Sequence, residues 1–142
     1  MKKLKIGLDI HGVIDSHKGT IVFLANRWRG MGHEIHIITG EGWETAQKAV
    51  DDLGVKYDRH FSIVDYHRSI GTKMELKESG WWMGRDEWDR TKGDYCRREG
   101  IDLMFDDTHR YARWMPQATT FVLVGRDFAD VAPVIADIAV AE

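Results

Sequence analysis

Four short apolar runs lie along the chain, and segments with a helical spacing of apolar positions separate them. The runs cover residues 4–10, 34–39, 101–106 and 119–124 and are rich in Ile, Leu, Val and Phe. Short runs of this composition are typical of buried strands. The pattern therefore predicts four strands of a central sheet.

Five segments have apolar side chains three or four positions apart, the spacing of one face of a helix. Glycine commonly ends a helix, and glycines follow the first three segments. The positions are Ile21, Leu24, Ala25 and Trp28 before Gly30 and Gly32; Trp43, Ala46, Val50 and Leu53 before Gly54; Ile63, Tyr66, His67 and Ile70 after Ser62 as N-cap and before Gly71; residues 85–99; and residues 130–140, with Pro133 in the first turn. Strands that alternate with helices favour a parallel sheet with right-handed crossovers and helices on both faces.

The composition fits one domain with a sizeable core, since 43% of the 142 residues are hydrophobic. No repeat or linker divides the chain, so we expect a single α/β domain over residues 1–142. The net charge of −3 comes from well-mixed acids and bases, which argues against duplex nucleic acid as a partner. No apolar run approaches a membrane span of roughly 18 residues, and the single Cys96 cannot form an internal disulfide. The expected compartment is the cytoplasm.

Residues 72–88, TKMELKESGWWMGRDEW, are the least regular part of the chain. Gly80 and Gly84 interrupt helical periodicity there, and Trp81 and Trp82 are adjacent. A long irregular segment in a compact domain is more often functional than idle. We therefore expect a lid or flap loop.

Polar residues and glycines lie at or just beyond the ends of three of the predicted strands. They are Asp9, His11 and Gly12, then Thr39 and Gly40, and finally Asp106 and Asp107. Ligands of open parallel sheets bind where the carboxyl ends of the strands meet. A single aspartate there often only caps a loop or helix, but the whole set favours a site. Carboxylates brought together need a shared proton or a cation, and Mg²⁺ is the obvious candidate.

A lysine lies on the apolar face of the fourth predicted helix. Trp88, Lys92 and Tyr95 fall at i, i+4 and i+7, so Lys92 shares an aromatic stripe that should face inward, whereas Asp89 and the other charges mostly face elsewhere. Such a lysine usually extends its ammonium past the aromatics to solvent. Acids and a phosphate nearby would give it a buried partner instead. Lys73 is the rival for this role.

These motifs together resemble those of the haloacid dehalogenase (HAD) superfamily, here as a small member without a large cap domain. GLDIHGVID resembles the first motif, with Asp9 as nucleophile, and IIT the second, with Thr39 holding the phosphoryl group. Lys92 matches the basic residue of the third, and MFDDTHRY resembles the fourth, with Asp106 and Asp107 at the metal. The resemblance implies a Rossmann-like (HAD-like) three-layer sandwich around a parallel sheet.

It also implies a magnesium-dependent phosphatase that works through an aspartyl-phosphate. Mg²⁺ would bridge Asp9, the backbone carbonyl of His11, Asp106 and a phosphate oxygen, with Asp107 as ligand or supporting residue. Backbone amides after Asp9, including that of Gly12, would hold the phosphate with Thr39, Lys92 and the adjacent Gly40. The substrate would be a phosphorylated small molecule, and Trp81 and Trp82 are candidates to stack on a nucleobase or sugar.

His11 departs from this family pattern, because phosphatases of the family have an aspartate there as general acid and base. An imidazole can perform both proton transfers, but the sequence leaves the direction of its pKa shift open. Two alternatives remain at this point. One is a HAD-fold binding protein that has lost turnover, and the other is transfer to an acceptor other than water.

Overall fold

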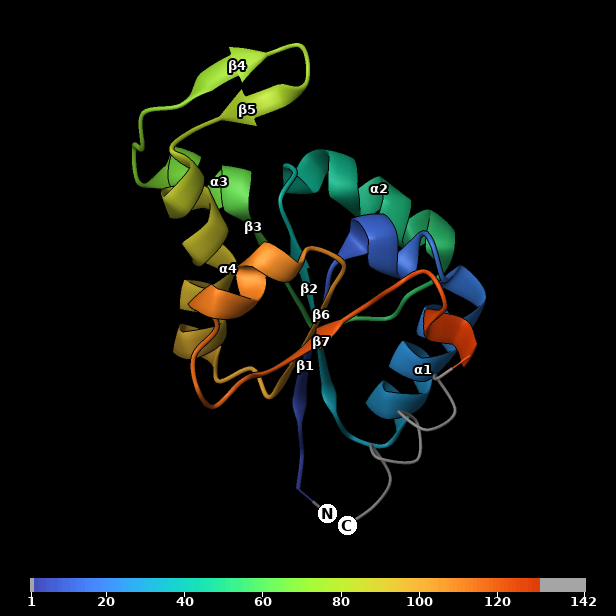
Figure 1. Cartoon of the computed structure of the whole chain (residues 1–142). Helices are drawn as coiled ribbons and strands as arrows, with labels where there is room; N and C mark the ends of the chain where they lie inside the picture. The colour runs from blue at the N-terminus through green and yellow to red at the C-terminus, as the bar shows by residue number, and fades with distance from the viewer. Residues whose placement is uncertain (1, 131–142) are drawn as a thin grey trace.

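The computed structural model describes residues 2–130 of the chain. A parallel five-stranded sheet lies at its centre, with the strand order β3-β2-β1-β6-β7 (Figure 1). The strands are β1 (Lys5–Leu8), β2 (Glu34–Thr39), β3 (Arg59–Ser62), β6 (Leu103–Asp106) and β7 (Thr120–Leu123). The four predicted strands are confirmed, and β3 is an edge strand that was not predicted.

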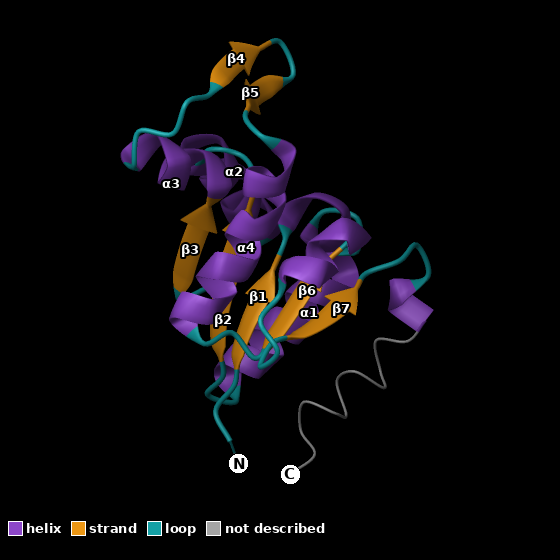
Figure 2. Cartoon of the chain, turned by 60° about the vertical axis from the view of Figure 1, so that its left-hand side comes forward, coloured by secondary structure: helices purple, strands orange, loops and turns teal. Residues whose placement is uncertain are grey.

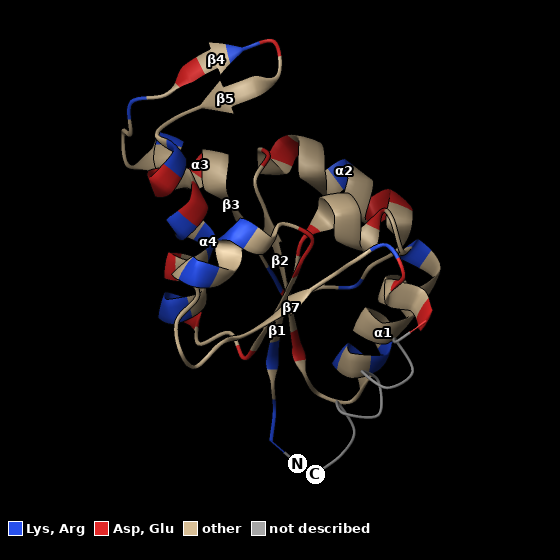
Figure 3. Ribbon diagram, in the orientation of Figure 1, with Lys and Arg blue, Asp and Glu red and all other residues tan. Residues whose placement is uncertain are grey.

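Helices cover both faces of this sheet (Figure 2). They are α1 (Lys18–Gly30), α2 (Trp43–Leu53), α3 (Ile63–Ser69) and α4 (Arg85–Glu99). Acidic and basic residues are interspersed along α4 (Figure 3). Consecutive residues of a strand point to opposite faces, so Ile37 joins a core with Trp28 of α1, and Ile38 joins a second core with Tyr95 of α4. The result is the predicted three-layer α/β sandwich.

Most of the predicted capping residues lie at the ends of helices as expected. The Ser62 hydroxyl accepts the Asp65 amide at 3.1 Å and caps α3, and Gly54 ends α2 with a φ of 79°. Ile70 was expected on the buried face of the third helix, but it lies just beyond α3 and is 57% exposed. The fifth predicted helix, residues 130–140 with Pro133, lies outside the described residues except for its first position.

Residues 72–88 form regular structure rather than an irregular loop. They contain an antiparallel hairpin of β4 (Glu75–Lys77) and β5 (Gly80–Trp82), which projects from the body between α3 and α4 (Figure 1). Two short helical turns complete the fold, Ile10–Ile14 after β1 and His109–Trp114 after β6. Within residues 2–130, no helix has both the length and the apolar character to cross a membrane.

Candidate active site

The strand β1 lies where the chain reverses its progress across the sheet. The chain adds β2 and β3 on one side of β1 and then β6 and β7 on the other. Ligands bind at such a switch point, beyond the carboxyl ends of the strands. Asp9 directly follows β1 and donates its amide to the Phe105 carbonyl at 3.0 Å, and Asp106 is the last residue of β6. Pairing of the two strands therefore brings both carboxylates together.

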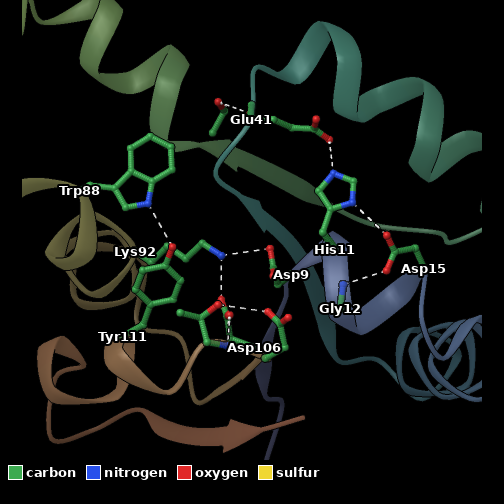
Figure 4. A network of polar contacts seen from close by, with 12 residues as sticks. Asp9, His11, Gly12, Asp15, Glu41, Trp88, Lys92, Asp106 and Tyr111 are labelled. Atoms are coloured by element: carbon green, nitrogen blue, oxygen red, sulfur yellow. Dashed lines mark hydrogen bonds and ion pairs between the residues drawn. The ribbon is translucent and has the colours of Figure 1, made fainter. Parts of the chain in front are cut away.

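Lys92 reaches the same point from α4. Its Nζ donates to Asp9 Oδ1 at 3.0 Å and to Asp106 Oδ2 at 2.7 Å (Figure 4). The Lys92 side chain is 2% exposed, and the ring centre of Tyr111 lies 5.0 Å from its Nζ. The rival Lys73 is exposed on the segment that leads to β4. The lysine at the strand ends is therefore Lys92.

Lys92 provides one positive charge for the two buried carboxylates of Asp9 and Asp106, so negative charge is in excess at this point. Burial is the main influence on Asp9, and with the negative charges of Asp106 and Asp107 it raises the Asp9 pKa to about 6 although Lys92 opposes the shift. Burial also opposes the charged form of Lys92, but Asp9 and Asp106 outweigh it and hold the Lys92 pKa above its usual range. Lys92 therefore stays protonated, while Asp9 retains affinity for another cation or a proton.

Asp107 adds a third carboxylate to the cluster. Oxygens of Asp9, Asp106 and Asp107 lie within 4.8 Å of one another, close enough to share a metal ion. Asp107 packs over Gly12, whose φ is 81° and where a Cβ would overlap the Asp107 carboxylate. The Thr108 amide donates to Asp106 Oδ1 at 3.0 Å and helps to orient that side chain. A set of carboxylate oxygens of this kind suits a hard divalent cation.

His11 lies at the rim of the site between two acids from different segments. Its Nδ1 is 2.9 Å from Asp15 Oδ2, and its Nε2 is 3.0 Å from Glu41 Oε1 (Figure 4). The Asp15 hydrogen bond, supported by Glu41, raises the His11 pKa above its ordinary value despite partial burial. The Gly12 amide also donates to Asp15 Oδ1, at 2.8 Å, so Asp15 connects His11 to the backbone of the turn after β1.

A cleft of about 490 Å³ opens over these groups. The predicted residues that line it are Asp9, His11, Thr39, Gly40, Trp81, Lys92 and Asp107. Thr39 lies at the end of β2, and a Cβ on Gly40 would lie 2.9 Å from the Trp88 indole, which forms another wall of the cleft. Asp106 lies below the surface of the cleft, and Trp82 lies outside it with 52% of its surface exposed.

Sequence reasoning missed several contacts between distant segments. Asp89 was expected to face away from the buried side of its helix, but it is 5% exposed and accepts from Arg110 Nε at 2.9 and 3.1 Å. The Tyr111 hydroxyl, 23 residues from Trp88 along the chain, accepts the Trp88 indole N–H at 3.0 Å. The contact of His11 with Asp15 had a signal in the sequence, since Asp15 is an acid four residues after His11. The Asp89–Arg110 and Trp88–Tyr111 contacts had none.

The chain matches no family model and no curated protein. The case for a function therefore depends on the fold and on the chemistry of the site. Three converging carboxylates, an ammonium, a hydroxyl and an imidazole can together hold a divalent cation, bind an anionic group and transfer a proton.

Proposed function

We propose that the protein is a magnesium-dependent phosphohydrolase of the HAD superfamily that acts on a small phosphate ester through an aspartyl-phosphate. The observation that carries the proposal is the contact of Lys92 with both Asp9 and Asp106 at the switch point of the sheet. Burying these charges is costly, and such an arrangement fits a site that must bind both a cation and a phosphate. The order of the motif residues along the chain supports the same family.

The donor set fits a magnesium ion. Asp9, Asp106 and Asp107 would hold it, with the backbone carbonyl of His11 as a further oxygen ligand. The close carboxylates and the raised pKa of Asp9 indicate a demand for positive charge that Lys92 does not meet. When bound, the ion would supply Lewis-acid screening between the carboxylate nucleophile and the phosphate dianion.

The side chains of the cleft have distinct roles in this mechanism. The Asp9 carboxylate attacks phosphorus, the new Asp9–phosphorus bond forms and the ester bond breaks, while Lys92 and Thr39 hold the phosphoryl oxygens. His11 donates a proton to the leaving oxygen. Water then attacks the aspartyl-phosphate, His11 takes the proton of the water, and inorganic phosphate leaves with Asp9 restored.

An assay on a panel of phosphate esters, with and without Mg²⁺, tests the proposal. We expect turnover that requires Mg²⁺, is lost in Asp9→Asn and persists in Asp86→Asn, which changes an exposed acid of α4 outside the cleft. Mass spectrometry of rapidly quenched wild-type protein should find the phosphoryl group on Asp9. Full activity of Asp9→Asn would reject this nucleophile, and absence of turnover on every ester would reject the function.

A binding protein without turnover is the second candidate. His11 favours it, because it occupies the position of the family's catalytic aspartate and its side chain is 63% exposed and engaged by two acids. The variants His11→Asp and His11→Ala separate the two candidates. Turnover only in His11→Asp would support the binding protein. An active wild type whose rate falls about 10²- to 10⁴-fold in His11→Ala would support catalysis by His11.

A further inference from the structure

A second hollow adjoins the catalytic cleft beside the β4–β5 hairpin. Its volume is about 540 Å³, and small-molecule pockets typically have roughly 300–1,000 Å³. Three indoles line it, those of Trp81, Trp82 and Trp88, together with the guanidinium groups of Arg85 and Arg110. Trp81 and Trp88 also line the catalytic cleft, so the two spaces are adjacent and share these walls.

The edges of two of these indoles are tied down by hydrogen bonds. Trp88 donates its N–H to the Tyr111 hydroxyl at 3.0 Å, and Trp82 donates its own to the Ser79 hydroxyl at 2.9 Å. With the polar edges satisfied, these rings can offer a ligand a flat apolar face. Lys77 Nζ lies over one face of Trp82, 5.3 Å from the ring centre, which leaves the opposite face for a ligand. Flat aromatic faces favour stacking with another planar ring.

The hairpin that carries Trp81 and Trp82 is anchored at its base. His67 of α3 contacts the Thr72 hydroxyl through Nδ1 and the Thr91 hydroxyl of α4 through Nε2, both at 2.8 Å. The Thr72 amide also donates to the His67 carbonyl at 2.9 Å. These bonds join the start of the hairpin segment to both neighbouring helices and thereby position this wall of the hollow.

The charged lining of the hollow consists of two arginines, Arg85 and Arg110, around one acid, Asp89. Arg110 uses its Nε for both oxygens of Asp89, and Arg85 Nε lies 3.9 Å from the same carboxylate. Within residues 2–130, no hydrogen bond uses the terminal amino groups of either arginine, so these remain available as donors, although the Arg110 guanidinium also lies over the Tyr111 ring. Guanidinium donors match the ring nitrogens and carbonyl oxygens on the edge of a nucleobase.

We propose that this hollow binds the base of a nucleotide, so that the substrate is a nucleoside monophosphate. The base would stack on the indoles and meet the arginine donors with its edge, while its phosphate lies at Asp9 and Lys92. A sugar phosphate has no planar ring for the indoles, and a simple aryl ester lacks a polar edge for the arginines. The placement of the phosphate at Asp9 rests on the proposed function. The hollow adds to that function the chemical class of the leaving group, a nucleoside.

A comparison of kcat/KM for the 5′-monophosphates of adenosine, guanosine, cytidine and uridine with that for ribose 5-phosphate tests the inference. The wild type should prefer its best nucleotide by about 5- to 150-fold, the range expected from base–aromatic stacking. The preference should fall toward one in Trp81→Ala and Trp82→Ala and persist in Phe23→Ala, which removes an exposed aromatic of α1 outside the hollow. Equal use of ribose 5-phosphate, or an unchanged preference in both tryptophan variants, would overturn the inference.

Failure of the proposed function can be told apart from failure of the hollow. If the wild type turns over no ester, equilibrium dialysis with adenosine and with guanosine, which carry no phosphate, examines the hollow alone. Saturable binding of either nucleoside that is weakened in Trp82→Ala would support a base-binding site without phosphatase activity. Absence of nucleoside binding, together with absence of turnover, would overturn both proposals.

Discussion

Replacement of the shared lysine should destabilise the fold strongly. Lys92→Met keeps a long apolar chain but removes the ammonium, which leaves Asp9 and Asp106 buried without their common partner. Removing one partner of a buried ion pair typically costs about 3–5 kcal/mol. Domains commonly have a free energy of unfolding of about 5–15 kcal/mol. The variant should therefore lose a large part of its stability at neutral pH.

The loss should shrink in acid, because a proton on Asp9 can replace part of the missing positive charge. Lys92 is the main group that lowers the pKa of Asp9, which burial raises to about 6 in the wild type. Without Lys92 the folded-state pKa of Asp9 rises further above its unfolded value. The folded variant then binds more protons than the unfolded chain, so its stability relative to wild type increases as the pH falls through this range.

Urea unfolding followed by tryptophan fluorescence at pH 7.5 and 5.5 measures both effects. Lys73→Met is the matched control, since Lys73 is exposed and its replacement should change stability by no more than about 0.5 kcal/mol. Adding Asp9→Asn to Lys92→Met should recover part of the loss because it removes one unpaired charge. An unfolding midpoint for Lys92→Met equal to wild type at pH 7.5 would refute the assignment of a buried charge network.

Two further predictions concern the metal and a buried histidine. Mg²⁺ at about 100 times its Kd should stabilise the wild type by about 2.7 kcal/mol. In thermal unfolding, the same Mg²⁺ concentration should stabilise Asp107→Asn less than the wild type. Equal shifts of the two proteins would argue against a metal site at the Asp107 carboxylate. Burial lowers the pKa of His36, whose ring contacts Tyr95 and Glu34. The folded protein therefore favours neutral His36, and the stabilisation that this residue provides is lost as the pH falls below the pKa of histidine in the unfolded chain, near 6.5. The cost of His36→Gln in urea unfolding should therefore be smaller at pH 5.5 than at pH 7.5, and a constant cost would contradict this.

Most of the sheet was predictable because its inner strands are buried on both faces. A strand such as β2, with five of its six residues buried, has a continuous apolar run that few other structures produce. The edge strand β3 has the sequence RHFS, with its first two residues exposed, and carries no such signal. The hairpin of β4 and β5 was missed for a similar reason, because most of its side chains face solvent on both strands.

The candidate site was predictable where position along a strand determines position in space. Asp9, Thr39 and Asp106 lie at carboxyl ends of neighbouring strands, and topology alone brings such residues to one edge. Lys92 was a candidate from its place on an aromatic stripe of α4, but that position alone did not separate it from its rival Lys73. The Asp89–Arg110 pair was not predictable, since it depends on how closely α4 packs against the turn after β6, where Gly93 faces the Trp114 carbonyl and a Cβ would overlap it.

The charges at the site form two separate groups, and this bears on the unusual His11. Asp9, Asp106 and Asp107 lie close to one another and the first two contact Lys92, whereas Asp15 and Glu41 hold the imidazole. A carboxylate at position 11 would meet Asp15 and Glu41 as like charges, and a neutral side chain would leave them without a cation. The surroundings of His11 therefore match an imidazolium and not the aspartate of the family pattern. In this arrangement Asp15 and Glu41 occupy both ring nitrogens of His11. In the proposed phosphohydrolase, His11 can therefore give a proton to a leaving oxygen only after its ring releases one of these two acids.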